Sequence, residues 1–266
     1  MDWVFRLDMH LFLLFSLVFV RISGLLVTAP MLGLKELPAR VKALLAAALA
    51  LVITPTQVDV SVEVPGTLVH YLVLVWGELV VGLSLGLGLA VLFSGIHLAG
   101  QLMGRISGLM LADVFDPASG ESVPQFSRLL FLVGMAVFVT IGGHRVLMAG
   151  LLDTFYTIRP GTALAYPSLG GAFVELLDQS FRLGVRAAAP VVTALLLSTL
   201  VMGLISRTLP QLNILAVGFG MNSLLVFAVL ALTLGGAAWV FQDQIEAALA
   251  VILDGLNAPF PGHWLG

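Results

Sequence analysis

The chain has 266 residues, of which 59% are hydrophobic and only 10% are charged, and its mean hydropathy is +1.09. Soluble domains usually carry about a quarter charged residues, so this composition excludes an ordinary water-soluble globular protein. The net charge is −3 and there is no polybasic run, which argues against nucleic acid as a partner. The chain has no cysteine, which excludes disulfides, thiolate catalysis and cysteine-ligated metal.

The apolar run near the N-terminus has the length of a secretory signal. Asp2 and Asp8 precede it, however, where a signal peptide carries positive charge, and Arg21 interrupts the apolar stretch. Pro30 directly follows the nearest small-residue cleavage site. We therefore expect a retained first helix at this position.

Six apolar segments are expected to form about six long, partly broken helices and helical hairpins of an all-α membrane protein. A helix that spans a bilayer needs about 20 apolar residues, and several of these segments are too short, too long or interrupted by a charge. We expect such helices to pack against protein over much of their surface, as in an assembly. The segments are Leu11–Leu34, Ala43–Thr54, Leu68–Gly100, Leu129–Gly142, Ala187–Ile205 and Ile214–Phe241.

Two connections between these segments have a recognisable character. Residues 58–64 alternate between apolar and polar side chains, which favours an extended linker over a short strand. Residues 206–213 are polar, contain Pro210 and separate two long apolar segments. They are predicted to form the tip of a helical hairpin.

The sequence gives little support to an enzyme, and we expect no catalytic, cofactor-binding or metal-binding residues. The five histidines include no pair at the i, i+4 spacing of a helical zinc motif. The glycine-dense stretch from Gly82 to Gly88 lies inside a long apolar run without a lysine. We therefore do not interpret it as a nucleophile elbow or a phosphate-binding loop.

Four ionisable residues lie in or beside apolar segments, namely Arg21, Glu78, Arg145 and Arg186. A charge that faces lipid costs about 2.5–3.5 kcal/mol on insertion scales, so each is expected to face protein or water. Glu78 could act as a proton or ion relay, or it could be paired with an arginine or with backbone donors of a neighbour. The structural role is favoured because relays usually place several acids in series, whereas Glu78 stands alone.

Gly82 and Gly86 are four residues apart within the third apolar segment. Small residues at this spacing let the backbone of another helix approach closely. Glycine is also common in membrane helices without such a role, so both interpretations stay open.

The most informative connection covers residues 108–122. Its Asp-Pro-x-x-Gly pattern favours a turn, and the bulky apolar residues before that turn need something to cover them. Apolar constrictions can close a pore by excluding water, and methionine can seal an irregular gap. A re-entrant turn buried against neighbouring helices accounts for the same residues, and spacing alone favours it slightly. The candidate pore-closing residues are Met110, Leu111, Val114, Phe115, Asp116 and Pro117.

Several short motifs follow one another in an order that resembles the FliR family, the R-type subunit of the flagellar type III export gate. The injectisome counterpart of this family is the T-type export apparatus protein. The resemblance covers nearly the whole chain, and the order of the motifs is more specific than any one of them. The motifs are Val20–Pro30, Leu37–Val41, Asp116–Gly120, Gly142–Arg145 and Leu209–Asn213.

This resemblance implies a subunit that assembles with P-type and Q-type gate subunits (FliP and FliQ) into a helical channel. Unfolded flagellar proteins would pass through that channel, at the flagellar basal body in the bacterial inner membrane. FlhA- and FlhB-type export proteins and membrane lipid are further expected partners. Residues 1–185 would resemble a P-type subunit, and residues 186–266 a Q-type helical hairpin and tail. The family also makes a pore plug at about residues 108–122 the favoured interpretation of that connection.

Three rivals to a flagellar gate subunit remain at this point. An injectisome export-apparatus subunit would share the fold, and a scaffold would nucleate assembly without contacting substrate. A stand-alone secondary transporter should show inverted repeats with matching broken helices. Pro30 and Pro190 each follow an arginine, but this likeness does not extend into a repeat.

Overall fold

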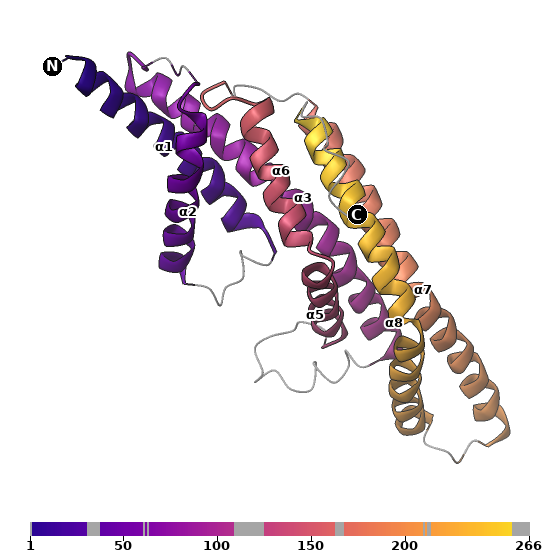
Figure 1. The fold of residues 1–266 in the computed structure, drawn as a ribbon. Helices are drawn as coiled ribbons and strands as arrows, with labels where there is room; N and C mark the ends of the chain where they lie inside the picture. The colour runs from indigo at the N-terminus through magenta and orange to yellow at the C-terminus, as the bar shows by residue number, and fades with distance from the viewer. Residues whose placement is uncertain are drawn as a thin grey trace. The chain divides into compact units, whose positions relative to one another are not determined.

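The computed structural model describes residues 2–30, 38–60, 62, 64–108, 125–162, 168–209, 211 and 214–256. Within these ranges the chain forms α-helices and one 3₁₀ helix and contains no strand, which confirms the predicted all-α fold (Figure 1). The described residues include four helices long and apolar enough to cross a membrane, or up to five if one bent helix pair counts as a span. The sequence predicted about six long, partly broken helices and helical hairpins.

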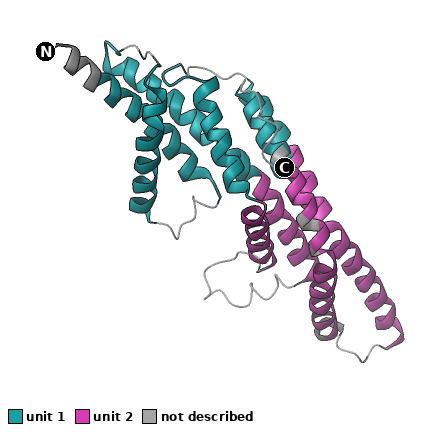
Figure 2. Ribbon diagram, viewed as in Figure 1, with its two compact units in different colours: residues 1–91, 142–177, 245–266 teal, residues 92–141, 178–244 magenta. Residues whose placement is uncertain are grey.

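The chain divides into two compact units (Figure 2). Unit 1 comprises residues 1–91, 142–177 and 245–266, and unit 2 comprises residues 92–141 and 178–244. The predicted division after residue 185 rests on likeness to two kinds of subunit, and it stays a prediction. The helices, in chain order, are α1 (Asp2–Thr28), α2 (Ala39–Ile53), the 3₁₀ helix η1 (Thr54–Gln57), α3 (Leu68–Ser107), α5 (Gln125–Thr140), α6 (Gly143–Thr157), α7 (Leu169–Thr208) and α8 (Ile214–Gly255).

Helix α1 ends earlier than the predicted segment, which continued to Leu34. The helix stops at Thr28, two residues before Pro30. Proline disfavours the helical conformation of the residue before it and cannot donate a helix hydrogen bond, so a boundary is expected there. The last four residues of the predicted segment lie outside the described residues.

Helix α6 is absent from the predicted set. The chain reaches Gly142, which adopts a left-handed conformation with φ 77°, and a new helix starts at Gly143. Glycine carries no Cβ and adopts this conformation readily, which explains why the break falls there. Helix α6 also contains His144, Arg145 and Asp153, so a search for apolar runs passes over it.

Helices α7 and α8 extend well beyond their predicted apolar runs, to 40 and 42 residues. The added first half of α7 is amphipathic and contains Glu175, Asp178 and Arg182, which an apolar search excludes. The predicted hairpin tip is confirmed, because α7 ends at Thr208 and α8 begins at Ile214.

The connection around residues 58–64 belongs to unit 1. Among its described residues no strand forms, and Val58 and Asp59 make a turn after η1. Val62 is buried in a cluster with Leu14, Leu17 and Leu74. Val60 packs against the same cluster, so two apolar residues of the linker hold it against α1 and α3.

Glycines let α1 and the first half of α3 approach closely within unit 1. A Cβ added at Gly82 would meet the backbone of Arg21, and one added at Gly86 would meet the Thr28 side chain and the backbone nitrogen of Ala29. A Cβ at Gly24 would lie 2.9 Å from the backbone nitrogen of Leu83. Both helices therefore contribute glycine to one contact, which is the packing mode that small residues four apart allow.

Unit 2 is built around an aromatic cluster. Phe93 of α3 makes edge-on contacts with Phe131 and Phe138 of α5 and with Phe241 of α8, at centroid distances of 5.1–5.9 Å. Such edge-to-face pairs add stabilisation beyond the area they bury. The cluster therefore joins three helices that lie far apart in the sequence.

Replacing Gly82 with alanine is expected to destabilise unit 1, because the new methyl group would overlap the carbonyl of Arg21. Overpacking of this kind costs typically about 1–3 kcal/mol. The measurement is the thermal unfolding midpoint of the purified protein in mild detergent. Gly171→Ala is the matched control, because a Cβ there meets nothing within 4 Å. Equal midpoints for the two variants would contradict the close helix contact.

Candidate functional site

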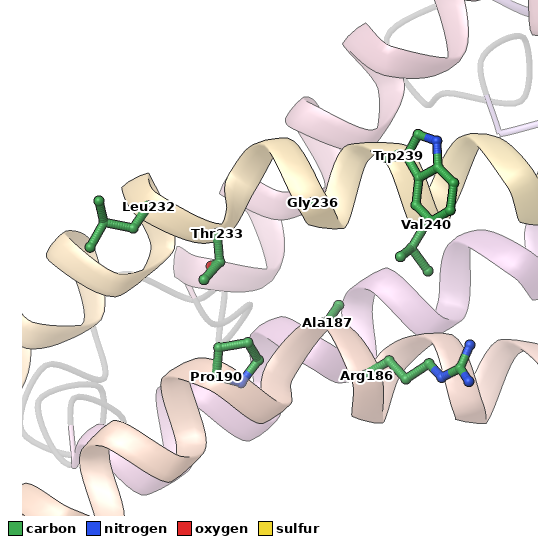
Figure 3. A pocket seen from close by; sticks show the side chains of 8 residues that line it. All are labelled: Arg186, Ala187, Pro190, Leu232, Thr233, Gly236, Trp239 and Val240. Carbon is green, nitrogen blue, oxygen red and sulfur yellow. The ribbon is translucent and has the colours of Figure 1, made fainter.

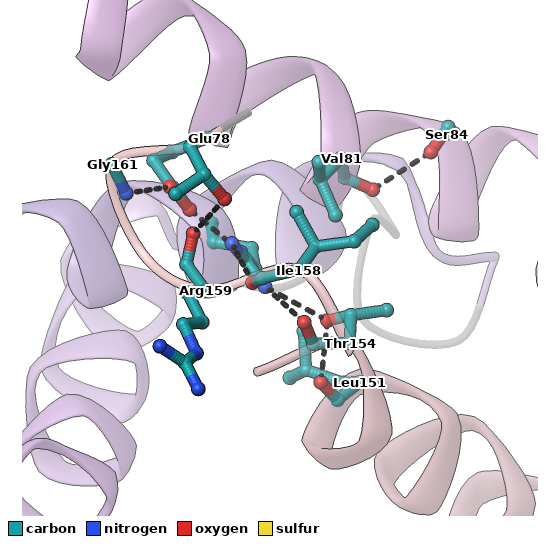
Figure 4. A network of polar contacts seen from close by, with 10 residues as sticks. Glu78, Val81, Ser84, Leu151, Thr154, Ile158, Arg159 and Gly161 are labelled. Carbon is teal, nitrogen blue, oxygen red and sulfur yellow. Dashed lines mark hydrogen bonds and ion pairs between the residues drawn. The ribbon is translucent and has the colours of Figure 1, made fainter. Parts of the chain in front are cut away.

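The most elaborate polar site in the described part of unit 1 is built around an ion pair inside the helix bundle. The Nε of Arg21 on α1 donates to Oε2 of Glu78 on α3 at 2.6 Å, and both side chains are fully buried. The other carboxylate oxygen of Glu78 accepts a hydrogen bond from the backbone N–H of Gly161 at 2.8 Å. Both oxygens of Glu78 are therefore engaged (Figure 4).

The remaining donors of Arg21 reach α6 and the turn that follows it. Nη1 donates to the carbonyl and the hydroxyl of Thr154 at 2.8 and 3.2 Å, and Nη2 donates to the carbonyl of Ile158 at 3.0 Å. The guanidinium also lies over the ring of Phe155, 4.4 Å from its centroid. Arg21 thus joins α1, α3, α6 and the turn after α6.

The turn after α6 has the conformation that this network requires. Gly161 has φ 85°, a region that residues with a side chain rarely adopt, and its N–H faces Glu78. A Cβ at Gly161 would also approach Val62 of the linker to 3.2 Å. Glycine at this position therefore allows a backbone donor to complete the carboxylate's hydrogen bonds.

The surroundings of Glu78 are those of a structural pair. A buried charge is tolerated when it is paired and its remaining hydrogen bonds are made, and both conditions hold here. A proton relay needs a chain of exchangeable groups, whereas Glu78 contacts a guanidinium and a backbone amide. The geometry can fix the relative position of three helices.

The sequence of residues 82–86 matches the Gly-x-Ser-x-Gly pattern of a nucleophile elbow. In the structure they lie in the middle of α3, and Ser84 is buried and donates to the carbonyl of Val81 at 2.8 Å (Figure 4). An elbow needs a sharp strand-to-helix turn that exposes the serine. This serine therefore has a role in helix packing.

The other two arginines selected from the sequence, Arg145 and Arg186, lie in different surroundings from the buried Arg21. Arg145 in the first turn of α6 and Arg186 on α7 are both exposed within this chain, and the expectation that each faces protein or water in the assembly stays a prediction. Arg145 follows the left-handed Gly142 at the start of α6, and a Cβ added at Gly142 would meet its guanidinium at 2.9 Å. Arg186 lies on the face of α7 that lines a groove in unit 2 (Figure 3).

The candidate pore-closing residues, from Met110 to Pro117, lie outside the described residues. The described flanks are the end of α3 at Ser107, with Gly108 at φ 81°, and the start of α5 at Gln125. The plug therefore stays a prediction. Searched over the same described residues, the chain has no cluster of three or more His, Asp or Glu residues that could hold a metal ion.

The model of the family described as bacterial export proteins, family 1, matches residues 12–248. The chain belongs to this family. The matched span begins in α1 and ends near the close of α8, so it includes Arg21, Glu78 and the turn at Gly161.

Curated relatives of this export protein carry a flagellar name. The chain is 32% identical to the flagellar biosynthetic protein FliR of Escherichia coli (strain K12), over 75% of this chain and 76% of the relative. It is 30% identical to the FliR protein of Bacillus subtilis (strain 168), over 83% of this chain and 85% of the relative. It is 29% identical to that of Caulobacter vibrioides, over 89% and 94% of the two chains.

Replacing Glu78 with glutamine is expected to destabilise the protein strongly, since it leaves the Arg21 guanidinium buried without a counter-charge. Removing one partner of a buried pair costs about 3–5 kcal/mol. The double variant Arg21→Met, Glu78→Leu should regain part of this loss. The Thr154 and Ile158 carbonyls would still lack their donor. Thermal unfolding of the purified protein and swimming motility of the complemented cells are the two measurements.

The double variant also separates the two interpretations of Glu78. With a structural pair, motility follows stability across the single and double variants. A double variant that is stable and abundant yet non-motile would show that the carboxylate itself is needed, and would favour the relay.

Proposed function

We propose that this protein is a structural subunit of the flagellar type III protein export gate and helps to form and seal its channel. The observation that carries the proposal is the match to the export family over residues 12–248, together with relatives named as flagellar biosynthetic proteins over most of their length. A helical membrane protein without strands in its described residues fits a channel subunit. The flagellar names of these relatives favour a flagellar over an injectisome role.

The protein is proposed to act without catalytic turnover. The buried polar groups around Arg21 and Glu78 are engaged with one another and with backbone atoms, which suits a rigid structural part. The work of moving an unfolded substrate is assigned to other components of the export apparatus.

Assembly with other subunits is supported by the apolar surface that the chain leaves open. Large apolar side chains are exposed on α2, α7 and α8, including Leu44, Val52, Leu200, Leu224 and Leu232. Exposed apolar surface of this extent needs lipid or protein to cover it. The proposed protein partners are the P-type and Q-type gate subunits and the FlhA- and FlhB-type export proteins, in the bacterial inner membrane.

The seal of the channel is proposed to lie at about residues 108–122, between α3 and α5. This connection joins the two helices that contribute Phe93 and Phe131 to the aromatic cluster of unit 2. The apolar residues of the connection could exclude water from the channel.

Affinity purification of the tagged protein from gently solubilised membranes tests the assembly. Mass spectrometry of the eluate should identify the P-type and Q-type gate subunits, and they should co-migrate with this protein on a native gel. A tagged unrelated inner-membrane protein serves as the control. Recovery of the chain alone, as a well-behaved monomer or dimer, would contradict a gate subunit and favour a stand-alone transporter.

Replacing Met110 and Phe115 with alanine tests the seal. If these residues close the channel, the variant complex should admit ions or small dyes that the parent complex excludes. The matched control is Met221→Ala with Phe181→Ala, which removes the same two residue types from exposed helix positions. Unchanged permeability of the test variant in an intact complex, or an equal leak through the control, would contradict the plug.

A further inference from the structure

Helix α6 of unit 1 has one buried face and one open face. On the buried face, Thr154 and Phe155 contact Arg21. On the open face, residues 145, 149, 152 and 156 recur at intervals of three or four and therefore form one stripe along the helix. Asp153 lies at the edge of this stripe, between the two faces. The α6 stripe comprises the exposed Arg145, Leu152 and Tyr156 and the half-buried Ala149 and Asp153.

Asp153 has a buried carboxylate oxygen without a partner among the described residues. Its Oδ2 is shielded from solvent and accepts no hydrogen bond there. The two ion pairs in the described part of the chain join Arg21 to Glu78 and Arg182 to Asp178, so neither supplies a cation to Asp153. An acceptor that loses water without gaining a donor costs free energy, and folded proteins rarely leave one so. Oδ2 therefore indicates a donor that the described residues do not contain.

Arg145 adds an opposite charge to the same stripe. Its side chain is exposed, and no described carboxylate lies within ion-pair distance of it. A cation in the first turn of a helix also gains nothing from the helix dipole, which is positive at that end. Arg145 and Asp153 are eight residues apart, which is about 12 Å along a helix. The stripe thus presents a cation and a carboxylate with Ala149 and Leu152 between them.

This arrangement favours a protein helix over a lipid as the occupant of the stripe. The headgroup layer of one leaflet is about 5–8 Å thick, so a headgroup at the level of one charge does not reach the other. A helix carries acidic and basic residues two turns apart at its ordinary spacing. The small side chain of Ala149, midway between the two charges, lets a second helix approach closely there.

We propose that the α6 stripe binds a helix of another export-gate subunit, which presents a lysine or arginine to Asp153 and a carboxylate to Arg145. The basic side chain donates to the buried Oδ2 of Asp153. Leu152 and Tyr156 pack beside the pair and exclude water, which strengthens the attraction between the charges. The inference rests on the proposed gate function and specifies one contact of this chain within that assembly.

The buried face of α6 holds the stripe in place. Arg21 donates to the carbonyl and the hydroxyl of Thr154, the residue next to Asp153. A rotation of α6 that moved Asp153 would break these hydrogen bonds. The carboxylate is therefore positioned before the neighbouring helix binds, which lowers the entropy cost of binding.

The variant Asp153→Asn tests whether the carboxylate acts within the chain or between chains. It removes the charge and keeps the shape of the side chain. The thermal midpoint of the purified free chain should not change, because the carboxylate has no partner there. In the purified gate complex, the neighbouring subunit should dissociate about tenfold faster or more, as expected when a buried charge at an interface loses its partner.

Asp178→Asn is the matched control. Asp178 is also an aspartate on a helix, but its carboxylate is already paired with Arg182 within the chain. This variant should leave the dissociation rate of the gate complex unchanged. A lowered thermal midpoint of free Asp153→Asn would place the missing donor within the chain and would overturn the proposal.

Photo-cross-linking identifies the neighbour. Tyr156 is replaced in cells by p-benzoylphenylalanine, a photoreactive aromatic residue of similar shape. Ultraviolet light should join it to another gate subunit, and mass spectrometry should find a lysine or arginine in or beside the linked peptide. Replacing that basic residue with aspartate should weaken the complex with the wild-type chain and restore the complex with Asp153→Lys.

Three results would overturn the stripe as a subunit contact. They are cross-linking only to lipid or to a second copy of this chain, unchanged dissociation of Asp153→Asn, and failure of the exchanged charges to restore the complex. If the gate subunits still co-purify with the wild-type chain, the proposed function stands while the stripe fails. Recovery of wild type without any gate subunit would overturn both.

Discussion

The ion pair between Arg21 and Glu78 is the constraint on which unit 1 depends. Moving two charges out of water costs several kcal/mol per ion, and their attraction offsets this only when the geometry is good and the other hydrogen bonds are made. Here the guanidinium donates to a carboxylate, a hydroxyl and two backbone carbonyls. The backbone N–H of Gly161 donates to the second oxygen of that carboxylate. The pair is therefore stable only while α1, α3, α6 and the turn at Gly161 are all in place.

The glycines of α1 and α3 and the ion pair support one another. Gly82 lies against the backbone of Arg21 itself, so the glycine contact brings α1 close to α3 at the level where Glu78 must be reached. A non-directional contact between smooth helix surfaces would allow the helices to slide. The directional hydrogen bonds of Arg21 remove this freedom and select one register.

Several features could be predicted from the sequence because they depend on local patterns. The apolar runs located most of the helices, Pro210 marked the hairpin tip, and the isolation of Glu78 in the sequence favoured a structural partner. That the partner is Arg21 could not be derived, because the two residues are 57 positions apart and no local rule joins them. Helix α6 and the amphipathic half of α7 were not predicted, because their polar residues interrupt the apolar runs from which helices were located.

The separation of these partners along the chain also bears on biosynthesis. Arg21 emerges from the ribosome 133 residues before Thr154. At about 5–20 residues per second, translation of that interval takes roughly 7–27 seconds. During this time α1 carries an arginine whose acceptors at Thr154 and Ile158 do not yet exist. Transfer of a charged arginine into lipid is opposed by about 2.5–3.5 kcal/mol. Stable placement of the first helix is therefore coupled to the completion of α6, which is reached only after more than half of the chain has been synthesised.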